Sequence, residues 1–312
     1  MALIIGTEVA TNGLESGAAL RLDSIRNLLE DTGFNTSMAS RETARNFLKT
    51  DWDLVVLISF STSSLLRQAR KRSKMLWFDP TDSWTLTRFS LLFGGDLKQA
   101  FILMRDLFFV WTSPKIDLIT FISERDSNIE KLWWVKRSVP LILPIDGLDR
   151  EVKLSKYPRL VFSGDGRYRP NKKALKFLSK TLEFLPSDLQ IHLIGRDLKT
   201  ASKRFIVHGY LSHQDMYFAN DIHLAPIKYG GGLKLKVAVP LWNGLRVIST
   251  PEGSSGFKKS PRLKIASTPL NFAQQILEIL RKDNQDEVFK PRNEIYLRHD
   301  GAEVRLWLAT IA

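Results

Sequence analysis

Three consecutive glycines and two nearby lysines stand out in the stretch PIKYGGGLKLKVAVPLWNGLRVISTPEGSSGF. Glycine allows backbone N–H groups to approach a phosphate closely, and a helix that begins beside them adds partial positive charge. We expect residues 230–232 to form a turn before a helix over 233–242. Lys234 and Lys236 would lie near the start of that helix, where they would neutralise a diphosphate. The alternative is a loose loop followed by a solvated helix face.

Further glycines follow apolar runs that are typical of strands. Ligands bind at the carboxyl ends of the strands in open α/β sheets, so a series of glycines at those ends indicates one crevice. The glycines in such positions are Gly164, Gly166, Gly195, Gly209, Gly230, Gly231, Gly232, Gly253 and Gly256.

Several common catalytic patterns are missing from the 312 residues. The five histidines show no ligand spacing such as H-E-x-x-H, and there is no cysteine, so we expect no metal, no cofactor and no disulfide. There is no G-x-x-x-x-G-K-S/T and no G-x-S-x-G, which disfavours P-loop hydrolysis and a serine nucleophile. Glycines, backbone amides and cations therefore remain as the candidate binding groups.

Apolar runs that alternate with helical patterns supply the elements that would position these groups. In the first half we expect strands at 2–5, 54–58, 75–78, 118–122 and 141–143, and a helix over 17–31 that Gly33 ends. In the second half we expect strands in RLVFSGDG, LQIHLIG, FIVHG, DIHLAPI and LRVIST, and a helix over 171–185. Continuous apolar strands of this kind predict parallel sheets that are covered on both faces.

The length of the chain suits two α/β domains. The segment ILPIDGLDREVKLSKYP, with its prolines, glycine and mixed charges, is typical of an interdomain linker. We predict a first domain over residues 1–149, a second over 150–295, and a C-terminal helix over 296–312 that packs back toward the first domain.

The chain carries 46 Lys and Arg against 33 Asp and Glu, a net charge of +13. Such a surface attracts anions, which include nucleotide phosphates, nucleic acid and an acidic membrane leaflet. Specific nucleic-acid binding is not expected, because no helix-turn-helix, zinc finger or RNP signature is present. We find no secretory signal and no transmembrane segment, which favours a cytoplasmic location.

The order of motifs resembles a known family. FSGDGRYRPNKKALKFL, IHLIGRD, VHGYLSHQDMYFANDIHLAPIKYGGGLKLKV and NGLRVISTPEGSSGF are similar, in this order, to the donor domain of the family 4 glycosyltransferases. In the first half ESGAALRLDSIRNLLEDTGFNT resembles the glycine loop and first helix of that family. DLITFISERD and VPLILPIDGLD resemble the segment that enters its second domain.

The resemblance implies the GT-B fold, in which two Rossmann-like, doubly wound parallel-sheet domains face a cleft. It also implies a retaining, metal-independent glycosyltransferase that passes a sugar from a nucleotide-sugar donor to an acceptor. By this resemblance the donor is bound by Gly17, Gly195, Tyr210, Leu211, Gly230, Gly231, Gly232, Lys234, Lys236, Thr250, Ser254 and Ser255. Tyr210, Leu211 and Gly195 would lie near the base, and the backbone around Thr250 would bind phosphates.

The sequence also departs from the family pattern. Many members carry a Glu-x7-Glu pair whose second glutamate holds the donor ribose, and the two positions are occupied here by Gly231 and Val239. The family's basic pair after the first donor-domain strand is out of register, and Arg167, Lys172 and Lys173 are the possible phosphate contacts nearby. Asp82, in WFDPTDSW, is the candidate catalytic residue; the alternative is that it caps the next helix.

Two features concern the acceptor. The basic cluster RQARKRSK and the Phe- and Leu-rich stretch RFSLLFGGDLKQAFILMRDLFFVW suit a peripheral contact with the inner face of an anionic membrane. The alternative is a buried helix beside a solvated helix end. The acceptor would be a glycan, a glycolipid or a lipid-linked oligosaccharide. A second hypothesis is a catalytically degenerate GT-B protein that binds glycan or a partner subunit, and a nucleotide-sugar epimerase is a minor alternative.

Overall fold

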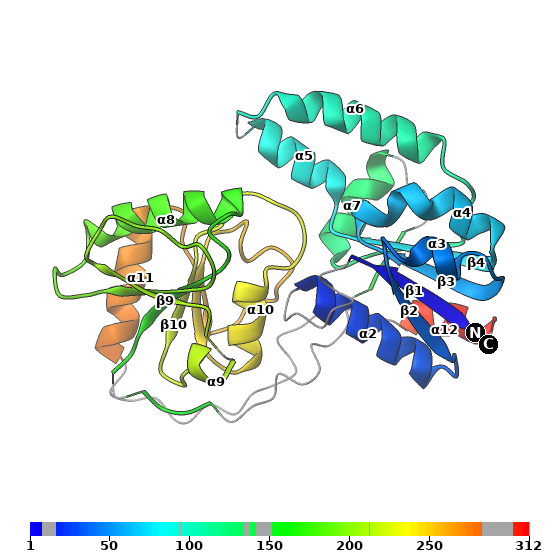
Figure 1. Cartoon of the computed structure of the whole chain (residues 1–312). Coiled ribbons are helices and arrows are strands. Elements are labelled where there is room, and N and C mark those ends of the chain that lie inside the picture. The colour runs from blue at the N-terminus through cyan, green and yellow to red at the C-terminus, as the bar shows by residue number, and fades with distance from the viewer. Residues whose placement is uncertain are drawn as a thin grey trace. The chain divides into compact units, whose positions relative to one another are not determined.

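The computed structural model describes residues 1–7, 17–93, 95–133, 138–141, 152–155, 157–211, 213–282 and 302–311. The chain divides into two compact units. The first comprises Met1–Ile145 together with Leu297–Ala312, and the second comprises Asp146–Tyr296. Each unit is an α/β layer structure of its own (Figure 1).

The first unit is built on a six-stranded parallel sheet of order β2-β1-β3-β4-β5-β6. Its strands are β1 Ala2–Gly6, β2 Thr36–Ser40, β3 Trp52–Ile58, β4 Ser73–Thr81, β5 Leu118–Phe121 and β6 Val139–Pro140. The predicted strands at β1, β3, β4 and β5 are confirmed. β2, which has no apolar run, was not predicted. The strand predicted at 141–143 is replaced by β6 at Val139–Pro140, which ends just before Leu141, and residues 142–143 lie outside the described part.

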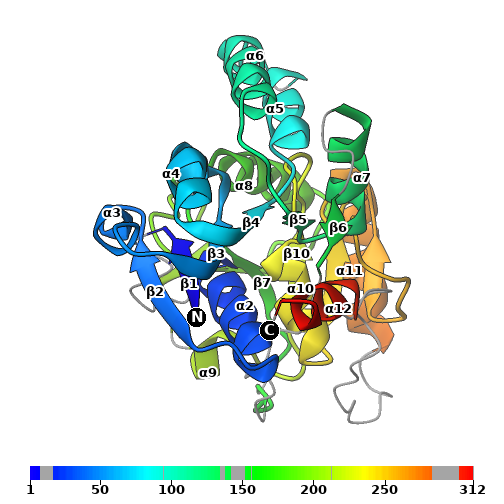
Figure 2. The same ribbon diagram turned by 90° about the vertical axis from the view of Figure 1, so that its right-hand side faces the viewer.

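Both faces of the first sheet are covered, because successive side chains of a strand point to opposite faces. Ile4 belongs to a core cluster with residues of α2 and α12, whereas Leu3 and Ile5 belong to a cluster with residues of α3 and α4. Figures 1 and 2 show α2 and α12 on one side of the strands and α3 and α4 on the other. The helices of this unit are α2 Gly17–Asp31, α3 Ala44–Phe47, the 3-10 helix η1 Phe60–Leu65, α4 Leu66–Lys71, α5 Trp84–Phe93, α6 Lys98–Trp111, α7 Glu124–Trp133 and α12 Ala302–Ala309.

Helix α2 has the predicted bounds and the predicted end. Gly33 has a φ of +90°, and the N–H of Phe34 donates to the carbonyl of Leu29 over 3.0 Å. A glycine in this left-handed conformation is a common helix terminator. The C-terminal helix α12 buries Val304 and Leu308 in the core of the same unit.

The second unit is built on another six-stranded parallel sheet, of order β12-β11-β10-β7-β8-β9. Its strands are β7 Leu160–Ser163, β8 Ile191–Ile194, β9 Phe205–Gly209, β10 Ile222–Ala225, β11 Arg246–Ser249 and β12 Leu263–Ile265. Its helices are α8 Arg169–Leu182, α9 His213–Met216, α10 Leu235–Trp242 and α11 Pro269–Lys282. The five predicted strands and the helices near 171–185 and 233–242 are confirmed, and β12 was not predicted.

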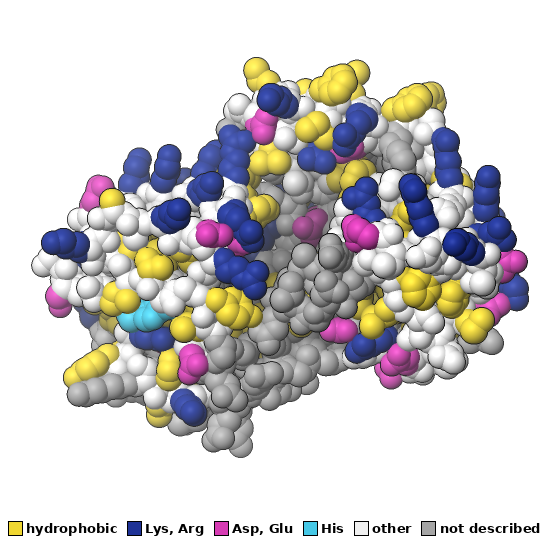
Figure 3. Space-filling view, viewed as in Figure 1, with side chains coloured by type: hydrophobic (Ala, Val, Ile, Leu, Met, Phe, Trp, Pro, Cys, Tyr) yellow, Lys and Arg dark blue, Asp and Glu magenta, His cyan; other side chains and the backbone are white. Residues whose placement is uncertain are grey.

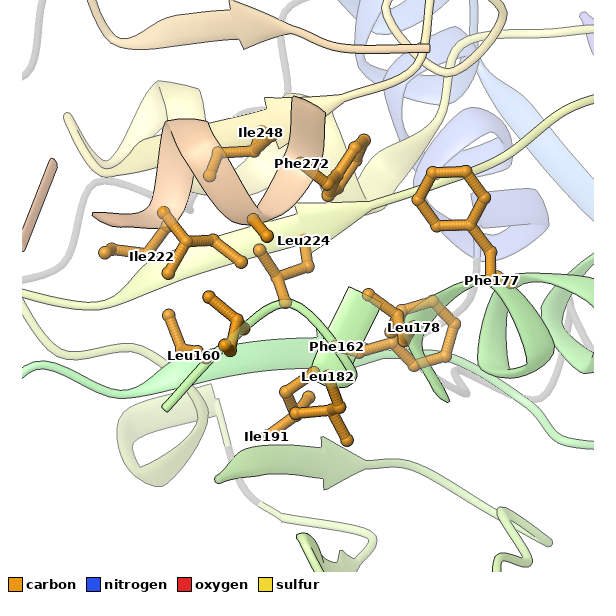
Figure 4. Packing of buried hydrophobic residues seen from close by; sticks show 14 of the residues in the cluster. Leu160, Phe162, Phe177, Leu178, Leu182, Ile191, Ile222, Leu224, Ile248 and Phe272 are labelled. Atoms are coloured by element: carbon orange, nitrogen blue, oxygen red, sulfur yellow. The ribbon is translucent and has the colours of Figure 1, made fainter. Parts of the chain in front are cut away.

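The core of the second unit lies between this sheet and two long helices. Leu160, Phe162 and Leu224 of the sheet pack against α8 and α11, whose Phe177 and Phe272 meet edge to face at 5.0 Å (Figure 4). Burial of one such side chain contributes about 1.5–3 kcal/mol. Helix α10 covers the opposite face. The strands are thereby fixed, and so are the loops at their carboxyl ends.

The strand order reverses at one place in each sheet. In the second unit the chain passes from β7 outward to β8 and β9, and then returns to place β10 on the other side of β7. In the first unit the corresponding place lies between β1 and β3. The carboxyl ends of strands at such a reversal are where open α/β sheets bind ligands.

Candidate functional site

Lys236 lies at the strand reversal of the second unit. Its Nζ donates to the carbonyl of Ser163, at the end of β7, over 2.8 Å and to Oδ1 of Asn171 over 2.6 Å. It also lies 4.4 Å from the centroid of the Phe162 ring. Among the described residues no carboxylate forms an ion pair with it, although an ammonium group has three N–H donors.

Burial, together with the nearby charge of Lys234, lowers the pKa of Lys236 to about 7. Desolvation disfavours the charged form of an amine, and an opposite charge within about 4–6 Å would favour it. The neutral acceptors around Lys236 do not supply that charge. A bound anion would, and this site is therefore electrostatically suited to a phosphate group.

Lys234 has a different arrangement from its neighbour. Its Nζ donates to the carbonyl of Gly230 over 3.1 Å, to that of Gly232 over 3.0 Å, and to that of Gly231. Gly230 and Gly232 have φ values of +116° and +73°, so the loop turns its carbonyls inward around the ammonium group. The three bonds direct the charge of Lys234 at the glycine loop, and its predicted contact with a diphosphate stays a prediction. Lys234 therefore holds this loop in shape.

The start of α8 adds positive charge beside the glycine loop. The N-cap residue Tyr168 makes no side-chain cap hydrogen bond, and the first turn carries no acidic residue. Lys172 and Lys173 are exposed on this end of the helix. A helix N-terminus with cations around it is suited to bind an anion.

Tyr229 connects the glycine loop to α8. Lys173 Nζ lies 4.8 Å from the centroid of the Tyr229 ring. The hydroxyl of Tyr229 is buried and has no hydrogen-bond partner among the described residues, and burial raises its pKa. A buried polar group without a partner costs about 1–3 kcal/mol, which a ligand could offset. Tyr229 and Asn171 were not predicted as site residues, since neither belongs to a glycine or lysine pattern.

The glycines after β7 and β8 are required by close backbone packing. A Cβ on Gly195 would lie 1.9 Å from the carbonyl oxygen of Gly164, and one on Gly166 would lie 1.9 Å from that of Asp197. The N–H of Gly195 donates to the carbonyl of Gly209 over 2.7 Å, and that of Gly164 to Ile194 over 2.9 Å. These glycines bring two loops together, and both N–H groups are used within the protein.

Arg167, a predicted phosphate contact, is balanced by two carboxylates. Its Nη2 lies 2.5 Å from Oδ2 of Asp165, and its Nε lies 3.4 Å from Oδ2 of Asp197. Hydrogen bonds from Arg167 lower the pKa of Asp165 to about 2. The local charge is thus cancelled, in contrast to that of Lys236.

The segment around Thr250, which was predicted to offer backbone donors to phosphates, makes several hydrogen bonds within the protein. Thr250 N–H donates to Ala225 over 3.4 Å, Ser254 N–H to Thr250 over 2.9 Å, and Ser255 N–H to Glu252 over 3.4 Å. Thr250 Oγ1 donates to the carbonyl of Ile227. These N–H groups form a turn that ties the end of β11 to the end of β10, because the chain reverses tightly there.

Tyr210 and Leu211 lie at the same edge of the sheet, directly after β9. Tyr210 is exposed, and the guanidinium carbon of Arg196 lies 5.2 Å from the centroid of its ring. β9 is two strands away from β7, which corresponds to roughly 10 Å along the sheet edge. Val239, at the family's glutamate position, is buried on α10 with 5% of its surface exposed.

In the first unit, Asp82 directly follows β4 and is exposed. Its N–H donates to the carbonyl of Pro80 over 3.0 Å. The side-chain cap of α5 is Ser83, whose Oγ accepts a hydrogen bond from the N–H of Leu86 over 2.9 Å. This capping bond is therefore made by Ser83 and not by Asp82. Gly17 is the first residue of α2, which follows β1 in the chain, and the loop before it lies outside the described residues.

The two-sheet architecture is similar to that of known glycosyltransferases. The alignment with the apo structure of OtsA covers 99% of this chain and 96% of the OtsA chain, with a TM-score of 0.54 and 10% sequence identity. An alpha,alpha-trehalose-phosphate synthase (UDP-forming) from Burkholderia xenovorans, in complex with glucose-6-phosphate, covers 100% and 98%, with a TM-score of 0.55 and 8% identity. This chain has the GT-B fold.

A glycosyltransferase from Rickettsia africae ESF-5 agrees with that assignment, covering 99% of this chain and 92% of its own at 10% identity and a TM-score of 0.54. No protein-family model matches the sequence, and no curated protein sequence does. The predicted GT-B fold class is confirmed, whereas membership of family 4 stays a prediction. No helix in the described part of the chain is long and apolar enough to cross a membrane.

Proposed function

We propose that the protein is a glycosyltransferase that moves a sugar from a nucleotide-sugar donor to a glycan, glycolipid or lipid-linked acceptor, with retention of configuration. The GT-B fold and the order of the sequence motifs support this function. The observation that carries the proposal is Lys236, a half-buried cation at the strand reversal with only neutral protein acceptors around it.

The chemistry of the transfer suits this arrangement. When the bond between the sugar and the diphosphate breaks, negative charge builds up on the departing phosphate oxygen. A preorganised cation in a partly desolvated site stabilises that charge more than water does. In the proposal Lys236 binds the diphosphate, and Lys234 holds the glycine loop beside the sugar.

The groups around this lysine have supporting roles in the proposal. Lys172 and Lys173, with the N-terminus of α8, attract the phosphates, and the Tyr229 hydroxyl donates to a donor oxygen. Tyr210, with Leu211, provides a flat surface for the base. Asp82 of the first unit contacts the sugar.

A ligand screen tests the proposal. We expect UDP, GDP or one of their sugars to raise the thermal unfolding temperature, since a ligand at about 100 times its Kd adds about 2.7 kcal/mol. For a chain of 312 residues the corresponding shift is about 4 °C. A folded protein that neither binds nor hydrolyses any nucleotide sugar in the panel would refute the assignment.

A catalytically degenerate GT-B protein is the second candidate, and Val239 favours it. The implied ribose-binding carboxylate is replaced here by a buried valine. A charge-assisted hydrogen bond from a ribose hydroxyl to such a carboxylate is worth about 1.5–3 kcal/mol. If the ribose site has decayed, Val239→Glu raises nucleotide affinity by about tenfold or more. Val239→Gln is the matched control for side-chain size, and an equal gain in both variants would exclude the charge as the cause.

A further inference from the structure

The exposed side of α6 carries a continuous row of large apolar side chains. Their positions follow a spacing of four and three residues, which places them on one face of a helix. Their exposed fractions range from 66% to 89%. The row consists of Leu97, Phe101, Met104, Phe108 and Trp111, and Phe93, 85% exposed, lies across the turn at the end of α5. We call these six residues the apolar row.

The opposite side of α6 is fixed against α5, so the apolar row does not belong to the interface between the two helices. Leu103 and Asp106 are buried, and Asp106 binds Nε of Arg88 on α5 over 3.1 Å. Figures 1 and 2 show the two helices side by side, projecting from the sheet of the first unit. Large exposed apolar patches on proteins commonly mark interaction sites.

The base of this helical pair is anchored. The N–H of Ser83 donates to Oδ1 of Asp126 over 2.9 Å, and the N–H of Thr85 donates to Oε1 of Glu130 over 3.0 Å. Both acids belong to α7 and are buried. The start of α5 is therefore held by hydrogen bonds to charged acceptors. Because α6 packs against α5, this anchor also fixes the side of α6 that carries the apolar row.

Cations border the apolar row, and the described acids of this helical pair are buried or half-buried. Lys98 and Arg105 lie on one flank of α6 and are exposed, and Arg105 also forms an ion pair with the buried Asp106 over 2.8 Å. At its other end, Arg67 of α4 donates to the carbonyl of Thr112 over 3.3 Å, which brings a basic helix next to Trp111. Figure 3 shows hydrophobic side chains along the outer edge of these helices, with Lys and Arg side chains among and beneath them.

The charges around the apolar row indicate which partner binds it. Of the acids on α5 and α6 and in their described connection, Asp106 is buried and Asp96 is half-buried. A second copy of this face would bring cations against cations, with no exposed acid to pair with them. Aromatic side chains with a cationic border suit the headgroup region of an anionic bilayer, where tryptophan is enriched.

We propose that the apolar row inserts into the headgroup region of a bilayer that contains anionic lipids, with Lys98, Arg105 and Arg67 binding the lipid phosphates. The row covers a helix of 14 residues, about 21 Å long, which lies in the plane of the membrane rather than across it. This docking is independent of sugar transfer, but it favours a lipid-linked acceptor.

The test is flotation of the full chain with vesicles of phosphatidylcholine alone and of phosphatidylcholine with about one-third phosphatidylglycerol. We expect binding to the anionic vesicles that weakens as the salt concentration rises. Phe101→Ser with Phe108→Ser should weaken binding by about tenfold for each side chain removed. Phe184→Ser, at an exposed phenylalanine of the second unit, is the matched control.

Two results would overturn the proposal. One is failure of the folded protein to bind anionic vesicles at low salt. The other is a concentration-dependent dimer that the Phe101→Ser and Phe108→Ser changes abolish, because a second copy would then be the occupant. Both substitutions are at exposed positions, so we expect them to leave the fold intact. An unchanged unfolding temperature would confirm that the variant is folded. Nucleotide-induced thermal shifts should be equal in all variants, which separates this test from that of the proposed function.

Discussion

The carboxyl ends of the two sheets hold charged groups in opposite ways. In the first unit, Arg21 donates to both carboxylate oxygens of Asp79, over 3.3 and 2.5 Å, and to the carbonyl of Leu141 over 2.6 Å. Thr120 donates to the same carboxylate. In the second unit, Lys236 has only neutral acceptors. A charge that the protein itself balances belongs to the fold, whereas a charge left unbalanced indicates a ligand.

Removal of one partner of the balanced pair should have the largest effect. Asp79→Ala leaves Arg21, with 2% of its side chain exposed, buried without a counter-charge. Loss of one partner of a buried pair costs about 3–5 kcal/mol. We expect a fall of this size in the free energy of unfolding, measured by urea denaturation.

A double variant is the control for this first prediction. Arg21→Met with Asp79→Leu removes both charges, and apolar replacement of a buried pair is often nearly neutral. It should recover most of the stability. If Asp79→Ala lowers the free energy of unfolding by less than about 1 kcal/mol, the balanced pair does not stabilise the first unit as we infer, and the contrast between the two sheet ends fails.

Removal of Lys236 should act on binding more than on folding. Lys236→Met replaces a desolvated amine with an apolar side chain of similar length, so we expect only the loss of its hydrogen bonds to Ser163 and Asn171, about 1–2 kcal/mol, which is less than for Asp79→Ala. The lost charge-assisted bond, about 1.5–3 kcal/mol, should weaken nucleotide binding by roughly 10- to 150-fold in titration calorimetry. Lys180→Met, at the other end of α8, is the control. Equal affinities of the two variants would contradict the role given to Lys236.

The pH dependence of nucleotide binding should follow the lowered pKa of Lys236. This lysine is half charged in the unliganded protein near pH 7 and is mostly neutral above it. An anion stabilises the charged form, so binding above pH 7 requires uptake of a proton and weakens as the pH rises. We expect the Kd to increase by up to about tenfold per pH unit between pH 7 and 8.5.

Two variants control for other groups that titrate in this range. Lys236→Arg keeps its charge at every pH in the range, and Lys236→Met has none, so both should give a flat profile. A rise in Kd that persists in Lys236→Met would assign the effect to another group.

Much of the fold could be predicted from local patterns. The apolar strands and the glycine that ends α2 are short-range signals, and the structure agrees with them. β2 escaped prediction because its sequence, TSMAS, has no apolar run; its strand form comes from pairing with β1, where Ala2 lies opposite Thr36. Such pairing is a tertiary effect that local propensity does not contain.

The candidate site was predicted less well, because residue type does not give side-chain direction. Lys234 and Lys236 differ by two positions, and the sequence assigned both to a diphosphate. The positive φ values of the glycine loop turn its carbonyls toward Lys234, while Lys236 reaches β7 and Asn171. The N–H groups after β11 were predicted as ligand donors, but the tight turn at Thr250 uses them.

The smallest predicted effect concerns Arg167, which sharpens the contrast with Lys236 within one unit. Both are cations near the carboxyl end of β7, but Arg167 is exposed and already paired with Asp165 and Asp197. Its removal should therefore weaken nucleotide binding by about threefold or less at pH 7, since exposed pairs are screened by water and salt. Asp165→Asn should instead strengthen binding slightly, because Arg167 then has one carboxylate fewer to balance it. If Arg167→Ala weakens binding as strongly as Lys236→Met, a cation that the protein already balances serves the ligand equally well, and charge balance does not distinguish fold from site.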